Sequence, residues 1–331
     1  KKMAILVTGA TSAVGYFIAK KLREEYPKTE IKALIRSEKK YPELEELGIN
    51  FVKGDLTDKE SLVKALEGID DIYNAAGEAR DDIPSRLYYD VNVTGTKNLL
   101  EAFIENKGKK FLHISTVGIY GYKIKNQPIK EEHPKKSDHP YHETKWIAEQ
   151  LVFKYAKEHG FFAAAVRPPY IVGPMDRQVA PRIFNYLLND RKIPLVGTGK
   201  AVISFVHHED VARALVMCGA TEGANGKAFH VIGSTCTARE MFELAGEITG
   251  KEPIFQEISF PVAMIAAVFS EIMAKLKRST PKISRRRVNQ FSRTRVYSLE
   301  KINQIVGFEP EYSTKDAFQD AFDWMKEQKL A

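Results

Sequence analysis

The chain has 331 residues, of which 44% are hydrophobic and 28% are charged, and its formal net charge is +7. This composition excludes a disordered or fibrous protein and is typical of a soluble enzyme with one large domain or two unequal ones. Two cysteines, Cys218 and Cys236, are too few for a disulfide framework or a zinc cluster, which indicates a reducing, cytoplasmic compartment. The opening apolar run, residues 4–7, is too short for a signal peptide or a membrane span.

The first elements predict a dinucleotide-binding unit. Residues 4–15, AILVTGATSAVG, indicate a buried strand that enters a glycine-containing turn, and a helical pattern follows. Gly9 permits the tight turn, Gly15 lets the helix pack closely on the strand, and the amides of the helix N-terminus can receive a pyrophosphate. Ser12 or Ala13 stands where the backbone comes closest to the phosphates, and the Ser12 hydroxyl could donate to a phosphate oxygen. At this point cofactor binding and a plain strand–helix turn both remain open. The turn residues expected at the cofactor are Thr11, Ser12, Ala13 and Val14.

The following strands carry the signals for cofactor choice. Residues 31–35 form a strand that ends at Arg36, where a site for NAD usually has an acid for the ribose hydroxyls. An arginine there favours a 2′-phosphate and therefore NADP(H), although NAD(H) and a merely solvated basic loop remain alternatives. A third strand, residues 49–52, leads to Asp55, which suits adenine contact or helix capping. A fourth, from residue 69, ends in small residues that leave room for ribose and nicotinamide: Ala75, Ala76 and Gly77.

A tyrosine and a lysine four residues apart, Tyr141 and Lys145, share one face of a predicted helix. A lysine ammonium beside a phenol favours the phenolate, so Tyr141 can become an acid or base near neutrality. The spacing by itself also occurs on solvated helix faces. Here, however, a strand at residues 110–114 delivers Ser115 and Thr116 to the carboxyl edge of the sheet, where ligands bind in open α/β folds.

Seven motifs occur in order along most of the chain: TGATSAVG, GDLTD, NAAG, VNVTGT, HISTVGIYG, YHETK and RPPYIVGP. With them the chain resembles an extended short-chain dehydrogenase/reductase, and is most similar to the 3β-hydroxysteroid dehydrogenase and dihydroflavonol-reductase-like branches. The resemblance implies an α/β fold with a Rossmann-type doubly wound parallel sheet and a smaller, mostly helical C-terminal cap. It also implies a homodimer formed through helices around residues 92–106 and 142–158.

The same resemblance implies roles for single residues. Thr116, Tyr141 and Lys145 take the catalytic places. Asp55 and Leu56 lie near the adenine, and the region of Pro168 lies beside the nicotinamide. Ser12 is the clearest departure from the family pattern.

The later part of the chain is expected to build the substrate side. Residues 161–173 predict one more buried strand, and residues 174–200 a less regular insertion. We therefore assign 1–174 and 205–234 to the dinucleotide-binding domain and 175–204 and 235–331 to the substrate-binding cap. The adjacent pair His207 and His208 is expected to be structural, because no further ligands accompany it, and no metal site is predicted.

An apolar segment, residues 260–269, precedes a stretch from Ile272 to Leu299 that has nine basic residues and no acid. The apolar segment is too short to span a bilayer. The basic stretch can be a solvated loop or lid, a surface for an anionic membrane, or a site for a phosphate-bearing substrate. Nucleic acid is disfavoured, because no interleaved aromatic pattern or binding motif accompanies the charges. The nine residues are Lys275, Lys277, Arg278, Lys282, Arg285, Arg286, Arg287, Arg293 and Arg295.

The predicted function is hydride transfer between a nicotinamide cofactor and a hydrophobic alcohol or ketone, such as a steroid-like, isoprenoid or acyl compound. A nucleotide-sugar epimerase or dehydratase is the alternative. Ile203 and Ser204 stand where such enzymes usually have an Arg-Asp pair, which argues against it. A non-catalytic cofactor-binding protein is a second alternative, disfavoured because it would need none of the three catalytic residues.

Overall fold

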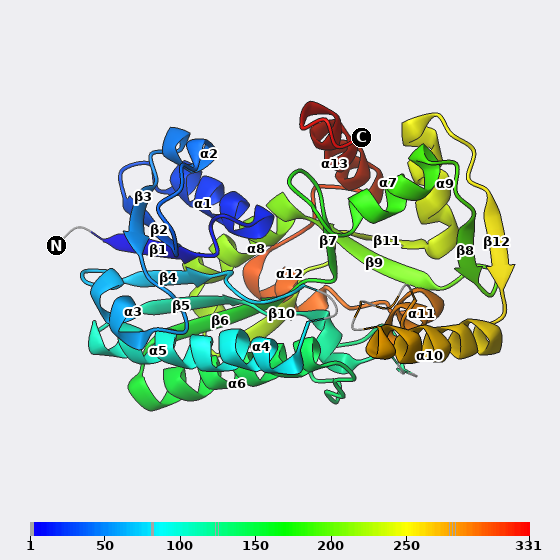
Figure 1. Cartoon of the computed structure of the whole chain (residues 1–331). Coiled ribbons are helices and arrows are strands. Elements are labelled where there is room, and N and C mark those ends of the chain that lie inside the picture. Colours follow the sequence, from blue (N-terminus) through cyan, green and yellow to red (C-terminus); the bar gives the residue numbers. More distant parts are fainter. Residues whose placement is uncertain are drawn as a thin grey trace.

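The computed structural model of the chain describes residues 3–80, 83–122, 124, 126–277, 279, 281 and 283–331. Seven parallel strands form its central sheet, in the order β10-β6-β5-β4-β1-β2-β3 (Figure 1). The strand order reverses at β1, which pairs with β2 on one side and with β4 on the other. Ligands bind at the carboxyl ends of the strands beside such a reversal. The strands are β1 (Ala4–Thr8), β2 (Glu30–Ile35), β3 (Asn50–Lys53), β4 (Asp71–Asn74), β5 (Lys110–Ile114), β6 (Phe162–Arg167) and β10 (Lys227–His230).

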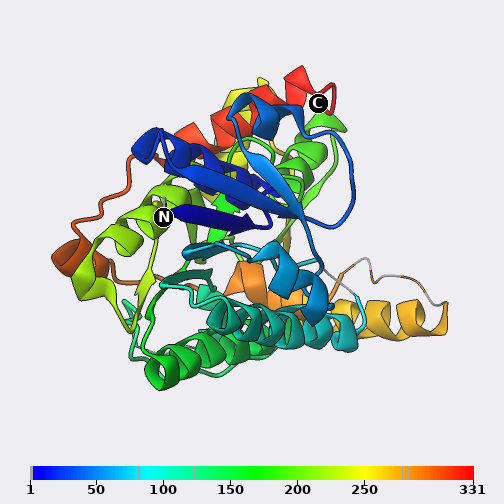
Figure 2. The ribbon, with the colours of Figure 1, turned by 90° about the vertical axis from the view of Figure 1, so that its left-hand side faces the viewer.

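Helices cover both faces of this sheet, as the view in Figure 2 shows. One face carries α1 and α8, and the other carries α3, α5 and α6 (Figure 1). Because both faces are covered, the strands are buried in continuous runs, such as all five residues of β1. The doubly wound parallel sheet expected from the sequence is confirmed. These helices and the shorter ones near them are α1 (Ala13–Glu25), α2 (Pro42–Glu46), α3 (Lys59–Ala65), α4 (Ser85–Tyr88), η1 (Tyr89–Thr94), α5 (Gly95–Glu105), η2 (Val117–Tyr120), α6 (Pro140–His159), α8 (His208–Ala220), η3 (Glu222–Ala224) and α12 (Glu300–Val306).

A second group of elements lies beyond the carboxyl ends of the central strands, at the right of Figure 1. It contains a three-stranded sheet, β11-β9-β7, a two-stranded sheet, β12-β8, and five helices. The helical C-terminal region is confirmed, and the two small sheets add strands that the sequence did not indicate. The elements are β7 (Tyr170–Val172), α7 (Ala180–Leu188), β8 (Ile193–Val196), β9 (Val202–His207), β11 (Ser234–Thr237), α9 (Ala238–Thr249), β12 (Phe255–Ile258), α10 (Phe260–Leu276), α11 (Arg285–Ser292) and α13 (Thr314–Glu327).

Two expectations for this region were wrong. The single strand predicted at residues 161–173 is two strands in different sheets, because Pro168 and Pro169 lie between β6 and β7 and have no amide hydrogen for a strand ladder. The stretch predicted to be irregular, residues 174–200, contains α7 and β8. The division of the chain into two domains at the boundaries given above stays a prediction.

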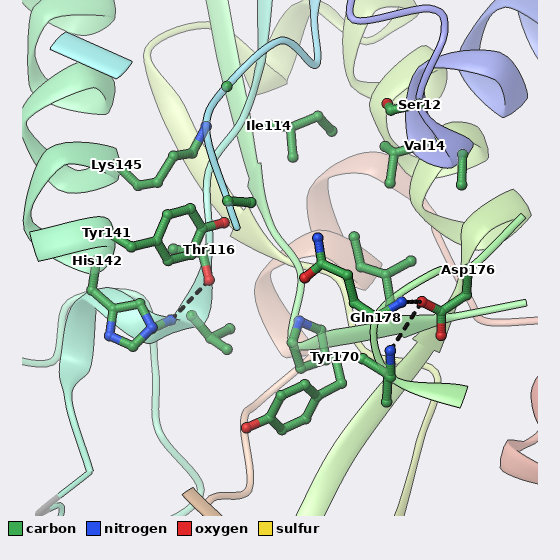
Figure 3. Close-up of a pocket in the computed structure, with 18 of the residues that line it drawn as sticks. Ser12, Val14, Ile114, Thr116, Tyr141, His142, Lys145, Tyr170, Asp176 and Gln178 are labelled. Carbon is green, nitrogen blue, oxygen red and sulfur yellow. Dashed lines mark hydrogen bonds between the residues drawn. The ribbon is translucent and has the colours of Figure 1, made fainter. Parts of the chain in front are cut away.

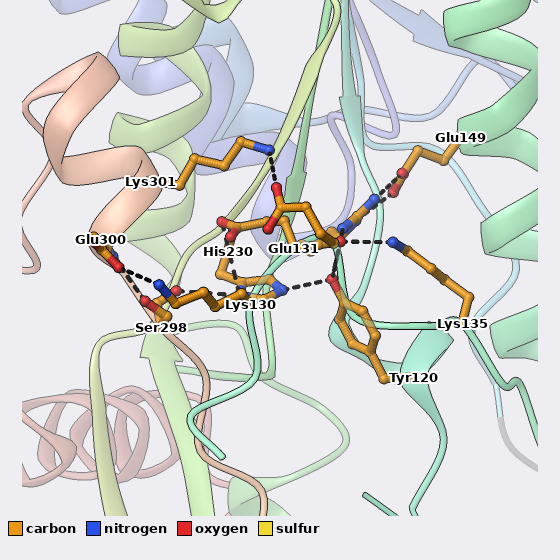
Figure 4. Close-up of polar contacts among 11 residues, drawn as sticks. Tyr120, Lys130, Glu131, Lys135, Glu149, His230, Ser298, Glu300 and Lys301 are labelled. Atoms are coloured by element: carbon orange, nitrogen blue, oxygen red, sulfur yellow. Dashed lines mark hydrogen bonds and ion pairs between the residues drawn. The ribbon is translucent and has the colours of Figure 1, made fainter. Parts of the chain in front are cut away.

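A buried ion pair joins the central sheet to α6 (Figure 4). Arg167, at the end of β6, contacts Glu149 of α6 through Nε to Oε2 at 2.9 Å and through Nη2 to Oε1 at 2.5 Å. The two residues are only 4% and 0% exposed. The hydroxyl of Tyr120 accepts a hydrogen bond from Nη1 of Arg167 at 2.6 Å and lies 2.8 Å from Nε2 of His230. Buried charges are tolerated only when they are paired, so each member of this network depends on the others.

Replacing one partner should therefore be costly. Arg167→Met is expected to lower the free energy of unfolding by about 3–5 kcal/mol, because it leaves the Glu149 carboxylate buried without its partner. The double variant Arg167→Met/Glu149→Leu should recover a large part of this loss, since neither charge remains. Urea unfolding followed by circular dichroism measures both. Equal stability of the single and double variants would contradict the prediction.

Candidate active site

A cavity of about 570 Å³ lies at the carboxyl ends of the central strands, between the sheet and the C-terminal elements. Its wall brings together residues that are far apart in the sequence, from the turn after β1 to the segment after α11 (Figure 3). The residues predicted for the site that line it are Thr11, Ser12, Ala13, Val14, Ala75, Gly77, Thr116, Tyr141 and Lys145. The predicted residues outside its wall are Gly9, Gly15, Arg36, Asp55, Leu56, Ala76 and Pro168.

The turn between β1 and α1 is shaped by two glycines. Gly9 has a φ of +70°, and a Cβ there would lie 2.7 Å from the amide nitrogen of Ala76. A Cβ on Gly15 would lie 2.1 Å from the carbonyl oxygen of Gly9. Any larger residue would therefore push α1 away from the turn. With four turn residues lining the cavity at the start of α1, the geometry fits the pyrophosphate of a dinucleotide.

Ser12 has a local role that the sequence did not indicate. Its hydroxyl donates to the carbonyl of Gly9 at 2.7 Å and accepts from the amide of Gly15 at 3.2 Å, so it caps α1. A hydroxyl has one proton. Donation to a phosphate oxygen, which we expected of Ser12, would break its bond to Gly9.

The residues expected around the adenosine lie at the ends of β2 and β3. Arg36 is exposed directly after β2, near Asp55. Partial burial raises the pKa of Asp55, but two hydrogen bonds from Thr57 and the charge of Arg36 outweigh it, so the net shift is downward. Leu56 is buried, and its Cβ lies 2.9 Å from the place that a Cβ on Gly95 would occupy. Leu56 thus fixes the packing of α5 beside this region.

Helix α6 carries Tyr141 and Lys145 into the cavity (Figure 3). The helix begins at Pro140, and the side chain of His139 caps it by accepting from the amide of Tyr141 at 3.1 Å. Lys145 is buried, which lowers the pKa of its ammonium to about 8, while Glu149 one turn further along favours the charged form. Lys145 therefore remains mostly protonated at pH 7. A Cβ built on Gly77 would lie 3.8 Å from its Nζ, so the ammonium reaches the end of β4.

Thr116 faces the same cavity from the turn after β5 (Figure 3). Its Oγ1 accepts from the amide of Gly118 at 3.0 Å, which leaves the hydroxyl proton available for a substrate oxygen. A Cβ on Gly118 would lie 2.2 Å from the ring of His142, so the absence of a side chain lets this turn approach α6. The carbonyl oxygen of Pro168, a residue expected beside the nicotinamide, accepts a hydrogen bond from the amide of Val117 at 3.1 Å and so fixes the start of this turn.

Ser115, the neighbour of Thr116, also lines the cavity, and its buried Oγ has no hydrogen-bond partner in the described part of the chain. Figure 3 shows Tyr170, Asp176 and Gln178 on the opposite wall. The sequence did not single out these three: Tyr170 lies on β7 within the RPPYIVGP motif, to which no role for the tyrosine was assigned, and Asp176 and Gln178 lie in the β7–α7 connection, which has no recognised motif. The carboxylate of Asp176 caps α7 through the amides of Gln178, Val179 and Ala180.

The basic stretch after Ile272 is divided among different environments. Arg286 and Arg295 line the active-site cavity, and Arg287 lines a second cavity. Arg285 is paired with Glu271 at 2.7 Å, and Arg293 stacks over the ring of Phe260. Lys275 and Lys277 are exposed at the end of α10, and Arg278 and Lys282 lie outside the described residues. The stretch is therefore more than a solvated loop.

The second cavity, of about 510 Å³, lies under α10 and α11 and is lined mainly by apolar side chains. It adjoins the active-site cavity, because the two share five lining residues. Its walls include Leu195, Phe242, Ile258, Val262 and Phe291. The shared residues are Tyr170, Gln178, Val179, Arg182 and Gln290.

Comparisons with known proteins agree with this geometry. The chain is 27% identical over 332 residues to the 2-alkyl-3-oxoalkanoate reductase of Stenotrophomonas maltophilia, covering 96% of this chain and 98% of the relative. It is 25% identical over 346 residues to the sterol-4-alpha-carboxylate 3-dehydrogenase, decarboxylating, of Candida albicans, covering 98% of each.

Solved structures extend over nearly the whole chain. The crystal structure of gox2253 superposes with a TM-score of 0.84 at 25% identity and covers 99% of each chain. The UDP-glucuronic acid 4-epimerase of Bacillus cereus in complex with NAD has a TM-score of 0.80 at 21% identity, covering 99% of this chain and 100% of the other, and shows the shared fold.

The family model for the NAD dependent epimerase/dehydratase family matches residues 5–232, which span the glycine turn, the Thr116 turn, helix α6 and β10. Relatives named as dehydrogenases and reductases match along the chain, as the motifs had indicated. The chain therefore belongs to the NAD dependent epimerase/dehydratase family and is an NAD(P)-dependent enzyme of the extended short-chain dehydrogenase/reductase type.

Proposed function

We propose that this enzyme transfers a hydride between a nicotinamide dinucleotide and a hydrophobic alcohol or ketone. The observation that carries the proposal is the apolar cavity next to Tyr170, which continues from the active-site cavity. A steroid-like, isoprenoid or acyl body gains free energy on leaving water for such walls, whereas sugar hydroxyls would lose hydrogen bonds there. The names of the relatives, an oxoalkanoate reductase and a sterol carboxylate dehydrogenase, support the same substrate class.

The roles of the catalytic residues follow from their positions. Thr116 donates its free hydroxyl proton to the substrate oxygen, and Tyr141 bonds the same oxygen and exchanges its proton with it. Lys145, mostly protonated at pH 7, favours the phenolate of Tyr141 and lies at the end of β4, where a nicotinamide ribose would bind. The nicotinamide supplies or accepts the hydride.

Tyr141→Phe should lower the rate of hydride transfer by about 10²–10⁴-fold, the usual contribution of a general acid, and leave cofactor affinity nearly unchanged. Single-turnover kinetics and cofactor titration measure the two effects. Tyr155→Phe is the matched control, because Tyr155 lies on the same helix and its hydroxyl donates to Glu101, away from the cavity. Unimpaired hydride transfer in Tyr141→Phe would remove Tyr141 from the catalytic role.

We also propose that NADP(H) is preferred over NAD(H). Arg36 is exposed after β2, with Asp55 as a nearby charge, and can hold a 2′-phosphate by charge-assisted hydrogen bonds. Arg36→Asp should shift the ratio of kcat/KM for NADPH over NADH towards NADH by about tenfold or more, because an anion then faces the phosphate. Arg86→Asp, an exposed arginine outside the cavity, is the control. An unchanged ratio in Arg36→Asp would refute the role of Arg36.

A nucleotide-sugar epimerase remains a second candidate function. It is favoured by the charge of the active-site cavity, where six basic and two acidic side chains line the wall. The name of the Bacillus cereus neighbour is consistent with it. The decisive assay compares NADPH oxidation with a 2-alkyl-3-oxoalkanoate against conversion of UDP-glucose or UDP-glucuronate in the presence of NAD. Turnover of the UDP-sugars alone would replace the proposed reaction.

Contact with an anionic membrane surface is the third part of the proposal, and α10 carries it. The helix turns alanines inward and large apolar side chains outward: Ile265, Phe269 and Ile272 are 70%, 66% and 53% exposed, at helical spacing. Its acid, Glu271, is paired with Arg285, and two exposed lysines follow. Among the described helices none is long and apolar enough to cross a bilayer. An apolar helix face next to basic side chains is the pattern of helices that lie in the headgroup boundary, and we propose this position for α10. Because Val262 of α10 lines the apolar cavity, a lipid in the membrane would lie close to that cavity.

The triple variant Ile265→Ser/Phe269→Ser/Ile272→Ser tests this surface by vesicle flotation. The unmodified protein should float with vesicles that contain phosphatidylglycerol, less at raised salt and not with neutral vesicles, because lysines near an anionic surface contribute about 1 kcal/mol each. The triple variant should lose flotation. Leu330→Ser, which removes an exposed leucine from the C-terminus, should not. Absence of the unmodified protein from both vesicle types would refute membrane contact.

Oligomeric state supplies a further control. We propose a homodimer through α5 and α6, as the family resemblance implies, in the cytoplasm. The α10 variants should then keep the mass of a dimer in sedimentation equilibrium. A change to monomer in the triple variant would instead show that α10 binds a second copy of the chain.

A further inference from the structure

Arg295 is a buried charge that faces the active-site cavity. It is 6% exposed and lines the cavity wall beside Tyr170. Its backbone is fixed along β9, because its amide donates to the carbonyl of Val202 and its carbonyl accepts from the hydroxyl of Ser204. Its guanidinium lies over the ring of Tyr122, with 4.9 Å from Cζ to the ring centroid. These contacts hold the side chain in one place.

The guanidinium has no acidic partner in the described part of the chain. Nη2 donates to the carbonyl of Gln290 at 3.1 Å, and Nε is buried without a hydrogen-bond partner among the described residues. The buried phenol oxygen of Tyr297, on the same cavity wall, lies beside the Arg295 guanidinium, whose positive charge opposes the effect of burial on the pKa of this phenol. A buried charge is normally paired, and leaving one unpaired is strongly unfavourable. No described residue supplies the missing counter-ion, which leaves that place to an anionic ligand in the cavity.

The acids of the cavity cannot supply it, because both have other partners. Glu78 is paired with Arg80 at 2.5 Å. Asp176 accepts three backbone amides at the start of α7. Arg295 therefore remains available to an anion that enters the cavity.

We propose that Arg295 binds a carboxylate on the substrate, so that the enzyme acts on a hydroxy or oxo acid with an apolar body. The carboxylate takes the donors of Arg295 and the phenol of Tyr297, and the apolar body passes Tyr170 into the second cavity. A sugar-nucleotide diphosphate would satisfy the same guanidinium. The carboxylate is preferred because the adjoining space is lined mainly by apolar side chains, which suit an apolar body better than a sugar or base. Only the apolar body of the substrate is taken from the proposed function; the carboxylate is inferred from Arg295 alone.

Binding without turnover tests the proposal. Decanoate and methyl decanoate are titrated calorimetrically into the protein saturated with NADP⁺, and UDP is titrated in parallel. Decanoate should bind at least tenfold more tightly than its uncharged ester, because only the acid can pair with Arg295. This comparison needs no variant. Equal affinity of acid and ester overturns the proposal.

Three variants separate recognition from a structural role. Arg295→Met should weaken the binding of decanoate at least tenfold and leave the affinity for the methyl ester unchanged. Its Tm should be equal to or higher than that of the unmodified protein, because an unpaired buried charge is removed. Arg295→Lys should restore part of the affinity. Arg293→Met is the control, since Arg293 stacks on Phe260 and lines neither cavity.

Two results contradict the assignment. The first is an affinity for decanoate that is unchanged in Arg295→Met. The second is a variant that binds UDP more weakly but decanoate as before, which would assign the site to a diphosphate. The carboxylate site and the proposed reaction can fail separately. If the protein binds decanoate through Arg295 but oxidises no NADPH with any oxo acid, the carboxylate site is supported and the proposed reaction is wrong.

Discussion

The placement of the proposed catalytic groups depends on the buried ion pair between Arg167 and Glu149. Glu149 lies one turn beyond Lys145 on α6, and Arg167 ends the strand that precedes Pro168. The third member, Tyr120, ends the short helix that begins after Thr116. One cluster of buried charges therefore ties together the three segments that carry the Thr116 hydroxyl, the α6 side chains and Pro168.

Further hydrogen bonds surround this ion pair (Figure 4). The backbone carbonyl of Glu131 accepts from Arg167, Tyr120 and Lys135, while its carboxylate accepts from the amide of His230. A network in which every member has partners holds one geometry, since any rearrangement leaves a buried polar group unpaired. The contrast with Arg295 is physical. Glu149 neutralises the Arg167 guanidinium, whereas no acid among the described residues pairs with the Arg295 guanidinium at the wall of the cavity.

The C-terminal elements give the active site two chemically different halves. Near Tyr141 and Lys145 the wall is polar and basic, and beyond Tyr170 it becomes apolar. Helix α10 continues this apolar character to the surface, because its small residues pack inward and its large ones face out. That pattern reverses the usual arrangement of a surface helix and leaves a hydrophobic stripe above an apolar cavity.

The sequence alone determined the parts of the protein that depend on local order. The glycine turn after β1, the succession of strands and the Tyr141–Lys145 spacing are local patterns, and the resemblance carried by the motifs that contain them implied the doubly wound sheet and the enzyme family. Local patterns also explain the errors. The paired prolines that split residues 161–173 were visible, but which sheet each half joins depends on distant partners.

The tertiary structure decided what depends on contacts between distant segments. Only the fold shows that Ser12 uses its hydroxyl to cap α1, and that Arg286 and Arg295 of the basic stretch turn into the cavity while Arg285 pairs with Glu271. In the sequence these arginines are equivalent charges in one run. Burial and counter-ions distinguish them, and both depend on how the chain folds. Glu271 pairs with Arg285 across the turn between two helices, whereas the aromatic neighbours of Arg295, Tyr122 and Tyr170, lie more than a hundred residues away along the chain.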